Sequence, residues 1–459
     1  MIWIRQLGLG RALFTLALAL VCAGPARAAE YLRWDKERHR VDASVQTWEV
    51  TPLLQRIAAT TKWQVYLQPG TKQQVPTRFR DLAEGEALRR LLGDLNFVIV
   101  PQSNAPARLY VFRTAREDAT ELIRAAELEA QAKAKRIEDE LVVKLKAGEK
   151  IEDVAGRYGA KVTGQLDELG LYRLKFTDAD SASKARESLL KDSSAASVDY
   201  NYSIPPPESP DATGATGPRL SLQPKAPADG KYIVVGLIDT AVQPQQGRLA
   251  DFLLDPLSAS SNAKPSADQP THGTAMAETI LNALSQVIGK DAASTVRILP
   301  VPVMGGTEGA STFDVGVGVY DAINAGAKII NLSLSGTGDS SFLHDIIKSG
   351  YDQGVRFFAA PGNDPVTTPT YPAAWPETTA VTALSAPGQI ADYANRSGIA
   401  TAAAPGTAMI TFNDQAYIVT GTSASTAFAT GVAAGLLDAK KVTLNQIGAA
   451  IQKLMPVPK

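Results

Sequence analysis

Four side chains in the C-terminal half of this 459-residue chain carry groups that together suit acyl transfer. In chain order they are Asp239, His272, Asn363 and Ser423. Transfer of an acyl group to water or an amine needs an oxygen nucleophile, a base that titrates near neutral pH, a carboxylate to orient that base, and donors for the oxyanion. The four residue types supply one of each, so the quartet is a candidate catalytic set.

Each of these residues alone also fits a structural role. A lone Asp at a strand end, such as Asp239, commonly caps a loop, and Asn363 suits a turn. His272 fits a helix cap as well as a functional group. Ser423 suits a helix N-cap, but a Ser there also meets the positive end of the helix dipole and keeps its own N–H free. Both features favour a negative oxygen nearby, so cap and nucleophile both remain open for Ser423.

The elements that must position the quartet alternate between strand and helix from about residue 230 to 459. The strand "YIVVGLID" ends at Asp239, and "VRFFAA" runs into "PGND", which contains Asn363. Helical runs begin around His272 in "THGTAMAETIL" and around Ser423 in "GTSASTAFATGVAAGLL". Near-continuous apolar strands separated by helices predict an α/β domain with a doubly wound, mainly parallel sheet. Ligands of such sheets bind at the carboxyl ends of the strands, which is where these residues lie.

On these segments the chain resembles the subtilisin-like serine protease family. The motifs that carry the resemblance are "VVGLIDTAV", "THGTAMA", "INLSLSG", "FFAAPGND" and "GTSASTAFATGVAAG". The resemblance implies that Ser423 attacks a peptide carbonyl, that His272 transfers the proton, and that Asp239 orients His272. It also implies that the Asn363 side chain and the Ser423 N–H hold the oxyanion.

The same resemblance implies an edge strand and an opposite wall that bind an extended polypeptide substrate. The implied residues are Leu332, Ser333, Leu334, Ser335 and Gly336 on the strand, and Ala359, Ala360, Pro361 and Gly362 on the wall. Gly336 would let the substrate backbone approach closely. Because no charged side chain marks this pocket, we expect an apolar or broad preference.

Several neighbours of the quartet depart from the family pattern. Gly is replaced at Ala241, Thr271 and Glu278, His at Ala275 and Phe428, and Pro at Ala427. These departures put activity level and pocket shape in doubt more than reaction type. We expect no cofactor, since no zinc spacing, phosphate loop or dinucleotide fingerprint is present. Many relatives bind calcium, but the sequence identifies no calcium or other metal site.

Two pieces precede this domain directly. Residues 139–203 have a βαββαβ pattern, close on "VDYNY", and resemble the propeptide of subtilisin-like proteases. We therefore expect a zymogen whose propeptide-like domain inhibits the enzyme. Residues 204–229 are rich in Pro, Gly and polar side chains, which predicts an extended, solvated linker where self-cleavage occurs.

The N-terminal part has an α+β pattern over residues 30–114, in the order β-α-β-β-α-β-β. It resembles the secretin and TonB short N-terminal (STN) domain, a binding module of cell-envelope proteins, which implies a cell-envelope partner. An unrelated α+β domain is the alternative. Residues 115–138 are rich in Ala, Glu, Lys and Arg, which predicts a charged helical spacer.

Residues 1–28 have the form of a signal peptide, with a basic start, the apolar run "ALFTLALALVCAG" and a small-x-small cleavage site ending at Ala28. An uncleaved anchor and a lipoprotein cut at Cys22 are the alternatives. Cys22 is the one cysteine of the chain, so the exported protein would have no disulfide and no thiolate chemistry. The net charge of -1 indicates no nucleic-acid partner. We expect export to the periplasm or the cell exterior.

Two other functions compete with a secreted, self-processed serine endopeptidase. One is a cell-envelope binding protein with a degenerate, inactive protease domain; the intact quartet argues against it. The other is an esterase with the same machinery; the peptide-binding strand and the propeptide-like domain argue against that. The expected organisation is a signal peptide (1–28), an STN-like domain (30–114), a spacer (115–138), a propeptide-like domain (139–203), a linker (204–229) and a catalytic domain (230–459).

Overall fold

The computed structural model describes most of the chain from Tyr31 to Pro458. The residues left out are 1–30, 36–37, 46–47, 75–76, 102–106, 120, 124–135, 216, 218–219, 245–248, 258–267, 290, 305–308, 365–367, 386–387 and 459. The predicted signal peptide and the stretch 124–135 of the predicted spacer therefore lie outside the described residues. No helix in the described part combines the length and apolar character needed to cross a membrane.

A six-stranded sheet forms the centre of the C-terminal domain, in the order β16-β14-β18-β19-β20-β21. Every neighbouring pair runs parallel, as the run of apolar strands predicts. The strands are β14 (Ile233–Asp239), β16 (Val296–Pro302), β18 (Ile329–Leu332), β19 (Arg356–Ala359), β20 (Thr378–Leu384) and β21 (Ala402–Pro405).

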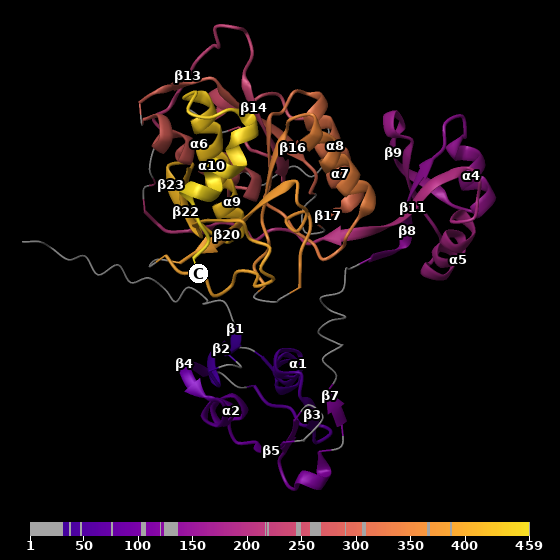
Figure 1. Cartoon of the computed structure of the whole chain (residues 1–459), viewed down its shortest axis with the longest axis vertical. Helices are drawn as coiled ribbons and strands as arrows, with labels where there is room; N and C mark the ends of the chain where they lie inside the picture. Colours follow the sequence, from indigo (N-terminus) through magenta and orange to yellow (C-terminus); the bar gives the residue numbers. More distant parts are fainter. Residues whose placement is uncertain are drawn as a thin grey trace, which may run out of the picture.

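Helices cover both faces of this sheet, which confirms the doubly wound prediction. Because alternate strand residues point to opposite faces, Val235 and Leu237 of β14 belong to one core cluster while Val234 and Ile238 belong to another. The first cluster includes α6 (His272–Ile288), α9 (Thr422–Asp438) and α10 (Ile447–Leu454). The second includes α7 (Thr312–Asn324) and α8 (Ser341–Asp352). Figure 1 shows these two helix groups on opposite sides of the domain.

An antiparallel hairpin leads into helix α9. It consists of β22 (Thr407–Phe412) and β23 (Gln415–Thr420), and β23 is followed almost at once by the helix that carries Ser423. Glu278 of α6 fixes the hairpin, because its two carboxylate oxygens accept the Thr411 N–H at 3.0 and 3.1 Å. The hairpin therefore joins the helix of His272 to the helix of Ser423.

The propeptide-like region has the predicted βαββαβ order. Its elements are β8 (Arg136–Leu145), α4 (Ile151–Tyr158), β9 (Lys161–Leu166), β10 (Leu171–Lys175), α5 (Ala179–Leu189) and β11 (Ala195–Ile204). The first strand begins at Arg136, slightly before the predicted boundary. The antiparallel sheet is extended by β17 (Ala310–Ser311) of the catalytic domain, which pairs with the end of β11.

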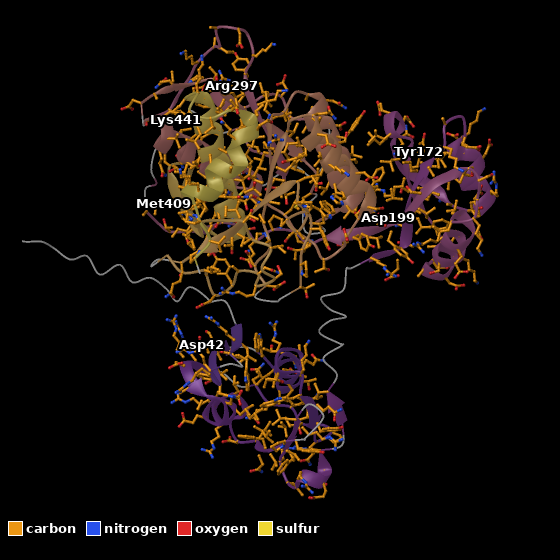
Figure 2. All side chains as sticks on the ribbon, viewed as in Figure 1. Asp42, Tyr172, Asp199, Arg297, Met409 and Lys441 are labelled. Carbon is orange, nitrogen blue, oxygen red and sulfur yellow. The ribbon has the colours of Figure 1, made fainter. Side chains whose placement is uncertain are left out.

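Side chains of β11 cap two helices of the catalytic domain. Asn201 is fully buried, and its Oδ1 accepts the backbone N–H of Phe313 at 3.1 Å, in the first turn of α7. The carboxylate of Asp199 accepts the backbone N–H of Ser341 at 2.7 Å, where α8 begins. Figure 2 labels Asp199 on the side of its domain that faces the catalytic domain. Free helix N–H groups are thus satisfied by the neighbouring domain, which ties the two domains together.

The linker is not the fully solvated segment that its composition predicts. β12 (Asp211–Ala212) pairs with β23, and β13 (Gln223–Pro224) pairs with β15 (Ala293–Ser294). Leu222 is fully buried in the catalytic core. An extended chain without internal hydrogen bonds offers its backbone to an open strand edge, and that tertiary pairing overrides the solvated state.

The N-terminal region consists of two sheets and two helices that share one hydrophobic core. The elements are β1 (Tyr31–Asp35), β2 (Arg40–Val45), α1 (Val50–Thr61), β3 (Gln64–Leu67), β4 (Thr77–Ala83), α2 (Glu84–Leu92), β5 (Asn96–Val100), β6 (Arg108–Phe112) and β7 (Glu121–Ile123). The predicted order is extended by one strand at each end, and β7 lies beyond the predicted boundary at 114, where the pattern predicts a helical spacer. The resemblance to the STN domain stays a prediction.

Candidate active site

The four predicted residues meet at the carboxyl edge of the parallel sheet. Asp239 is the last residue of β14, His272 the first of α6 and Ser423 the second of α9. Asn363 follows β19 in a loop and lines the same pocket as His272. Asn363 in turn bonds Thr422, the residue before Ser423. Residues far apart in the chain are therefore neighbours in the fold.

Asp239 and His272 form a buried pair. Nδ1 of His272 donates to Oδ1 of Asp239 at 2.8 Å and lies 3.0 Å from Oδ2, and the two residues are only 5% and 1% exposed. Gly273 allows this approach, because a Cβ there would lie 2.2 Å from the carbonyl oxygen of Thr240. The Thr240 hydroxyl accepts the Gly273 N–H at 2.8 Å. The end of β14 and the start of α6 are thereby held against each other.

A polar network fixes the entry into α6. Thr271 is the N-cap, and its hydroxyl accepts the Thr274 N–H at 3.1 Å. The same hydroxyl donates to the carbonyl of Ala241 at 2.6 Å. Gln243 accepts the Thr271 N–H at 2.8 Å. Two of the departures from the family pattern, Ala241 and Thr271, are therefore bonded to each other, and His272 is not itself the cap.

Ser423 lies inside the first turn of α9 and does not cap it. The N-cap is Gly421, whose φ of 152° few other residues adopt and which has no side chain to cap the helix. The alternative of Ser423 as an N-cap is therefore wrong. The Ser423 hydroxyl donates to the carbonyl of Ser333 at 3.1 Å. Among the hydrogen bonds of the described residues, none joins Ser423 and His272.

Asn363 is oriented by Thr422, a residue that the sequence reasoning missed. Oδ1 of Asn363 accepts both the N–H and the hydroxyl of Thr422, at 2.9 and 3.0 Å. The amide nitrogen is left on the pocket side, as an oxyanion donor requires. A Cβ on Gly421 would lie 2.8 Å from that nitrogen, so glycine is needed there for space as well. A hydroxyl directly before the candidate nucleophile was the signal that could have identified Thr422.

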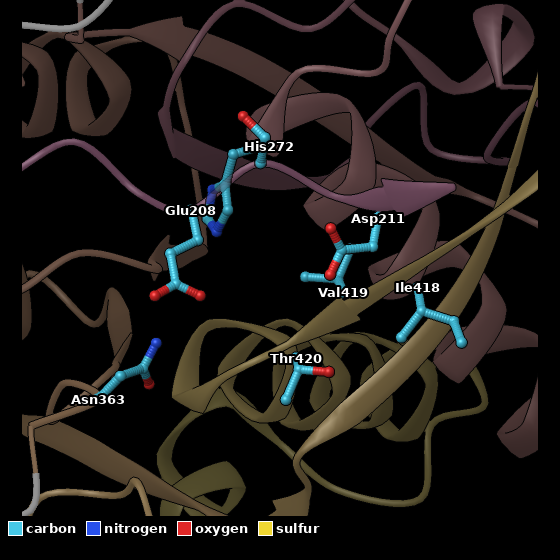
Figure 3. Close-up of a pocket in the computed structure, with 8 residues that line it drawn as sticks. Glu208, Asp211, His272, Asn363, Ile418, Val419 and Thr420 are labelled. Carbon is cyan, nitrogen blue, oxygen red and sulfur yellow. The ribbon is translucent and has the colours of Figure 1, made fainter. Parts of the chain in front are cut away.

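The linker enters this site. Glu208, Ser209 and Asp211 line the pocket that His272 and Asn363 also line. In Figure 3 the carboxylate of Glu208 lies between the imidazole of His272 and the amide of Asn363. No pattern in the sequence marks Glu208, because its position depends on strands β11 and β12 being anchored on either side.

The predicted substrate walls are mostly covered. Buried members are Leu332, Ser333, Leu334, Ala359, Ala360 and Pro361, whereas Ser335, Gly336 and Gly362 are partly exposed. The side chains of Leu332 and Ala359 pack in the core cluster of α7 and α8, and the part of these two residues in substrate binding stays a prediction. Each of these residues ends a buried strand, along which alternate side chains face opposite helix layers. Gly336 pairs with Tyr371, and a Cβ there would lie 3.4 Å from Ile204 of β11.

Glu278 is the one departure from the family pattern with a clear electrostatic consequence. Its side chain is buried on α6, and burial raises the pKa of Glu278 to about 7, partly offset by the hydrogen bond from Thr411. Within the described part of the chain, no group of three or more His, Cys, Asp or Glu side chains is placed to hold a metal ion.

Comparison with known proteins relates two parts of the chain to known families. Residues 230–453 match the Subtilase family, and residues 124–201 match the Fervidolysin N-terminal prodomain. Thermitase of Thermoactinomyces vulgaris is 29% identical over 243 residues, which cover 51% of this chain and 86% of thermitase. Subtilisin E of Bacillus subtilis is 28% identical over 310 residues, 63% of this chain and 76% of that protein. The Bacillus subtilis minor extracellular protease Epr is 31% identical, but the match spans only 31% of its length.

Among solved structures, fervidolysin from Fervidobacterium pennivorans superposes with a TM-score of 0.53 at 18% identity, covering 69% of this chain and 56% of that one. This likeness bears on the fold alone. The chain belongs to the subtilisin-like serine endopeptidases, with a Subtilase family domain at residues 230–453 behind a prodomain of the fervidolysin type.

Proposed function

We propose that the protein is a secreted serine endopeptidase, made as a self-processed zymogen, that hydrolyses peptide bonds through Ser423, His272 and Asp239. The observation that carries this proposal is the buried pair of His272 and Asp239, in which one ring nitrogen meets both carboxylate oxygens. A carboxylate only 1% exposed is costly to bury unless it is paired, and here it binds Nδ1 of the imidazole and leaves Nε2 available.

The proposed reaction gives each of these groups a role. The Ser423 oxygen attacks the substrate carbonyl carbon while its proton passes to Nε2 of His272. The carbonyl oxygen becomes an oxyanion that accepts hydrogen bonds from Nδ2 of Asn363 and the backbone N–H of Ser423. The peptide C–N bond then breaks, and His272 gives its proton to the leaving amine. Water, deprotonated by His272, cleaves the resulting ester and restores the Ser423 hydroxyl.

The zymogen form accounts for the resting hydrogen bonds of the site. With the linker in the pocket, the Ser423 hydroxyl is bonded to the Ser333 carbonyl at 3.1 Å rather than to His272. Hydrogen bonds between nucleophile and base are commonly long or poorly aligned before substrate binds. The active arrangement thus requires the linker to leave.

The propeptide-like domain and linker are proposed to be the inhibitor. Asn201 and Asp199 hold the prodomain on helices α7 and α8, and Arg173 pairs with Asp314 at 3.1 Å between the two domains. The strand β11 then delivers the linker past Gly336 to the catalytic pocket, where Glu208 occupies the space between base and oxyanion donor. Cleavage within residues 204–229 would separate this inhibitor from the enzyme.

Export rests on the N-terminal sequence. The signal-peptide pattern of residues 1–28 supports a periplasmic or extracellular location, where polypeptides are the substrates. A cell-envelope partner for the N-terminal domain rests on its resemblance to the STN domain.

A second candidate is a cell-envelope binding protein with an inactive protease domain. The observation that favours it is the Ser423 hydroxyl bonded away from His272. The intact Asp239–His272 pair and the oriented Asn363 amide favour the active enzyme, since neither would be needed for binding alone.

Self-cleavage distinguishes the two candidates. The full chain and its Ser423→Ala variant are incubated at equal concentration, and the N-termini of the products are sequenced. The active enzyme predicts a cut between residues 204 and 229 in the parent and an intact variant. A folded parent that stays intact, or a variant that is cut equally, would support the binding protein.

A further inference from the structure

A chain of buried polar groups runs between the helix of the nucleophile and the central strand β18. The Thr430 hydroxyl donates to Oδ1 of Asn331 at 3.0 Å, and Nδ2 of Asn331 donates to the Ser333 hydroxyl at 2.9 Å. The Ser333 hydroxyl donates in turn to the carbonyl oxygen of Ser423 at 3.1 Å. Thr430 and Asn331 are 0% exposed and Ser333 2%.

The place of Asn331 is unusual for a polar side chain. It lies in the middle of the parallel sheet, opposite Leu237 of β14 and Phe358 of β19. A buried amide in such a place is costly unless its donors and acceptors are paired, and an apolar residue would avoid the problem. Both ends of the Asn331 amide are paired, Oδ1 with Thr430 and Nδ2 with Ser333.

This series of hydrogen-bonded side chains holds α9 at two points on one face. Ser423 and Thr430 are two helical turns apart, so they face the same side of the helix. Ser333 also meets Ser423 a second time, because its carbonyl accepts the Ser423 hydroxyl. Both the carbonyl and the hydroxyl of Ser423 are therefore bonded to Ser333, the residue that follows β18.

We infer that Thr430, Asn331 and Ser333 are positioning residues that align the nucleophile and its oxyanion-binding N–H; the inference rests on the proposed function. The hydrogen bonds of this series all donate in one direction, from Thr430 toward Ser423. The Thr430 donor sets which end of the Asn331 amide faces Ser333, and the Asn331 donor then directs the single Ser333 O–H toward Ser423. Loss of one donor loosens the Ser423 backbone, which slows bond formation without weakening ligand binding.

The test measures covalent inactivation of the full chain by an alkyl fluorophosphonate, with the intact and self-cleaved forms read as separate bands. The maximal inactivation rate should fall about tenfold in Ser333→Ala and in the isosteric Thr430→Val, the worth of one buried hydrogen bond. The concentration for half-maximal rate should stay within about twofold of the parent, since binding is untouched. Thr430→Ser keeps the donor and should react like the parent.

Two further results are expected if the three side chains act as one connected series. The double variant Ser333→Ala/Thr430→Val should be little slower than Ser333→Ala alone, because both changes break the same connection. Ser425→Ala removes another fully buried hydroxyl of α9, bonded to Ala404 and Pro405, and should leave the rate unchanged even where it lowers the melting temperature. Parent-like rates in both single variants, additive losses, or an equal loss in Ser425→Ala would overturn the inference. Such results would leave the proposed function standing, whereas a parent that never reacts would refute both.

Discussion

The N–H and the hydroxyl of Thr422 both donate to Oδ1 of Asn363, at 2.9 and 3.0 Å. One residue thus fixes the orientation of the proposed oxyanion donor from the position next to the proposed nucleophile. The Thr422 hydroxyl also accepts the Gly362 N–H at 3.2 Å, so it couples the Asn363 loop to α9.

Loss of this hydroxyl should slow turnover with little change in substrate affinity. Thr422→Val keeps the volume but removes one of two bonds to Asn363, and we expect kcat to fall about tenfold, less than the loss from removing the amide itself. Thr422→Ser retains the hydroxyl and is the matched control. Steady-state hydrolysis of a peptide substrate measures both; a Val variant as fast as the Ser variant would contradict the assignment.

Glu208 should delay reaction of the unprocessed chain. Its carboxylate occupies the space between His272 and Asn363, so Glu208→Ala should open the site to a fluorophosphonate while the linker is still intact. We expect the full-length band to label several-fold faster than in the parent, on the scale of one lost polar contact. Asp211→Asn is the control, because Asp211 lines the same pocket but is anchored on β23. Equal labelling of the parent and Glu208→Ala would exclude a blocking role.

Asp199 should hold the prodomain on the enzyme after cleavage. Its carboxylate accepts the Ser341 N–H and hydroxyl, at 2.7 and 2.9 Å, at the positive end of α8. Asp199→Ala should weaken prodomain binding by about 1–2 kcal/mol, the usual worth of a helix cap.

Co-purification of the cleaved prodomain with the enzyme measures this binding. Asp180→Ala is the control, because the Asp180 carboxylate is exposed on the same domain and pairs only with Lys184 in the described structure. Retention of the prodomain by Asp199→Ala as firmly as by Asp180→Ala would show that the cap does not contribute.

Glu278 should make the stability of the catalytic domain depend on pH. The pKa of Glu278 is raised from 4.5 to about 7, so the folded state holds the proton more tightly than the unfolded state. The stability from this group is fully present below about pH 4.5 and is lost as the pH rises to about 7, an effect of about 3 kcal/mol.

Glu278→Gln removes the titration while keeping an oxygen for the Thr411 N–H. Its melting temperature should fall less than that of the parent between pH 5 and pH 8. Parallel curves for the two proteins across this range would show that Glu278 ionises normally in the fold.

Most of the catalytic layout follows from local sequence patterns. Asp239 ends an apolar strand and His272 starts a helix, and the parallel sheet that these patterns predict brings such residues to one edge. The four residues can be recognised together in the sequence because their side chains are chemically complementary.

Features set by long-range contacts could not be predicted in this way. Glu208 reaches the pocket only because β11 pairs with β17 and β12 with β23, and composition alone indicates a solvated linker. The burial of Leu332 and Ala359 likewise depends on which helix layer covers each strand face. The direction of the Ser423 hydroxyl depends on a carbonyl ninety residues away.

The central claim is that Asp239 and His272 make Ser423 a nucleophile. Its most direct test is the mass-spectrometric location and rate of the fluorophosphonate adduct in the full chain, Ser423→Ala and His272→Ala. The account predicts a single adduct on Ser423 that is absent from Ser423→Ala and forms at least about 10³-fold more slowly in His272→Ala. An adduct on another residue, or a His272→Ala chain that reacts at the parent's rate, would contradict it.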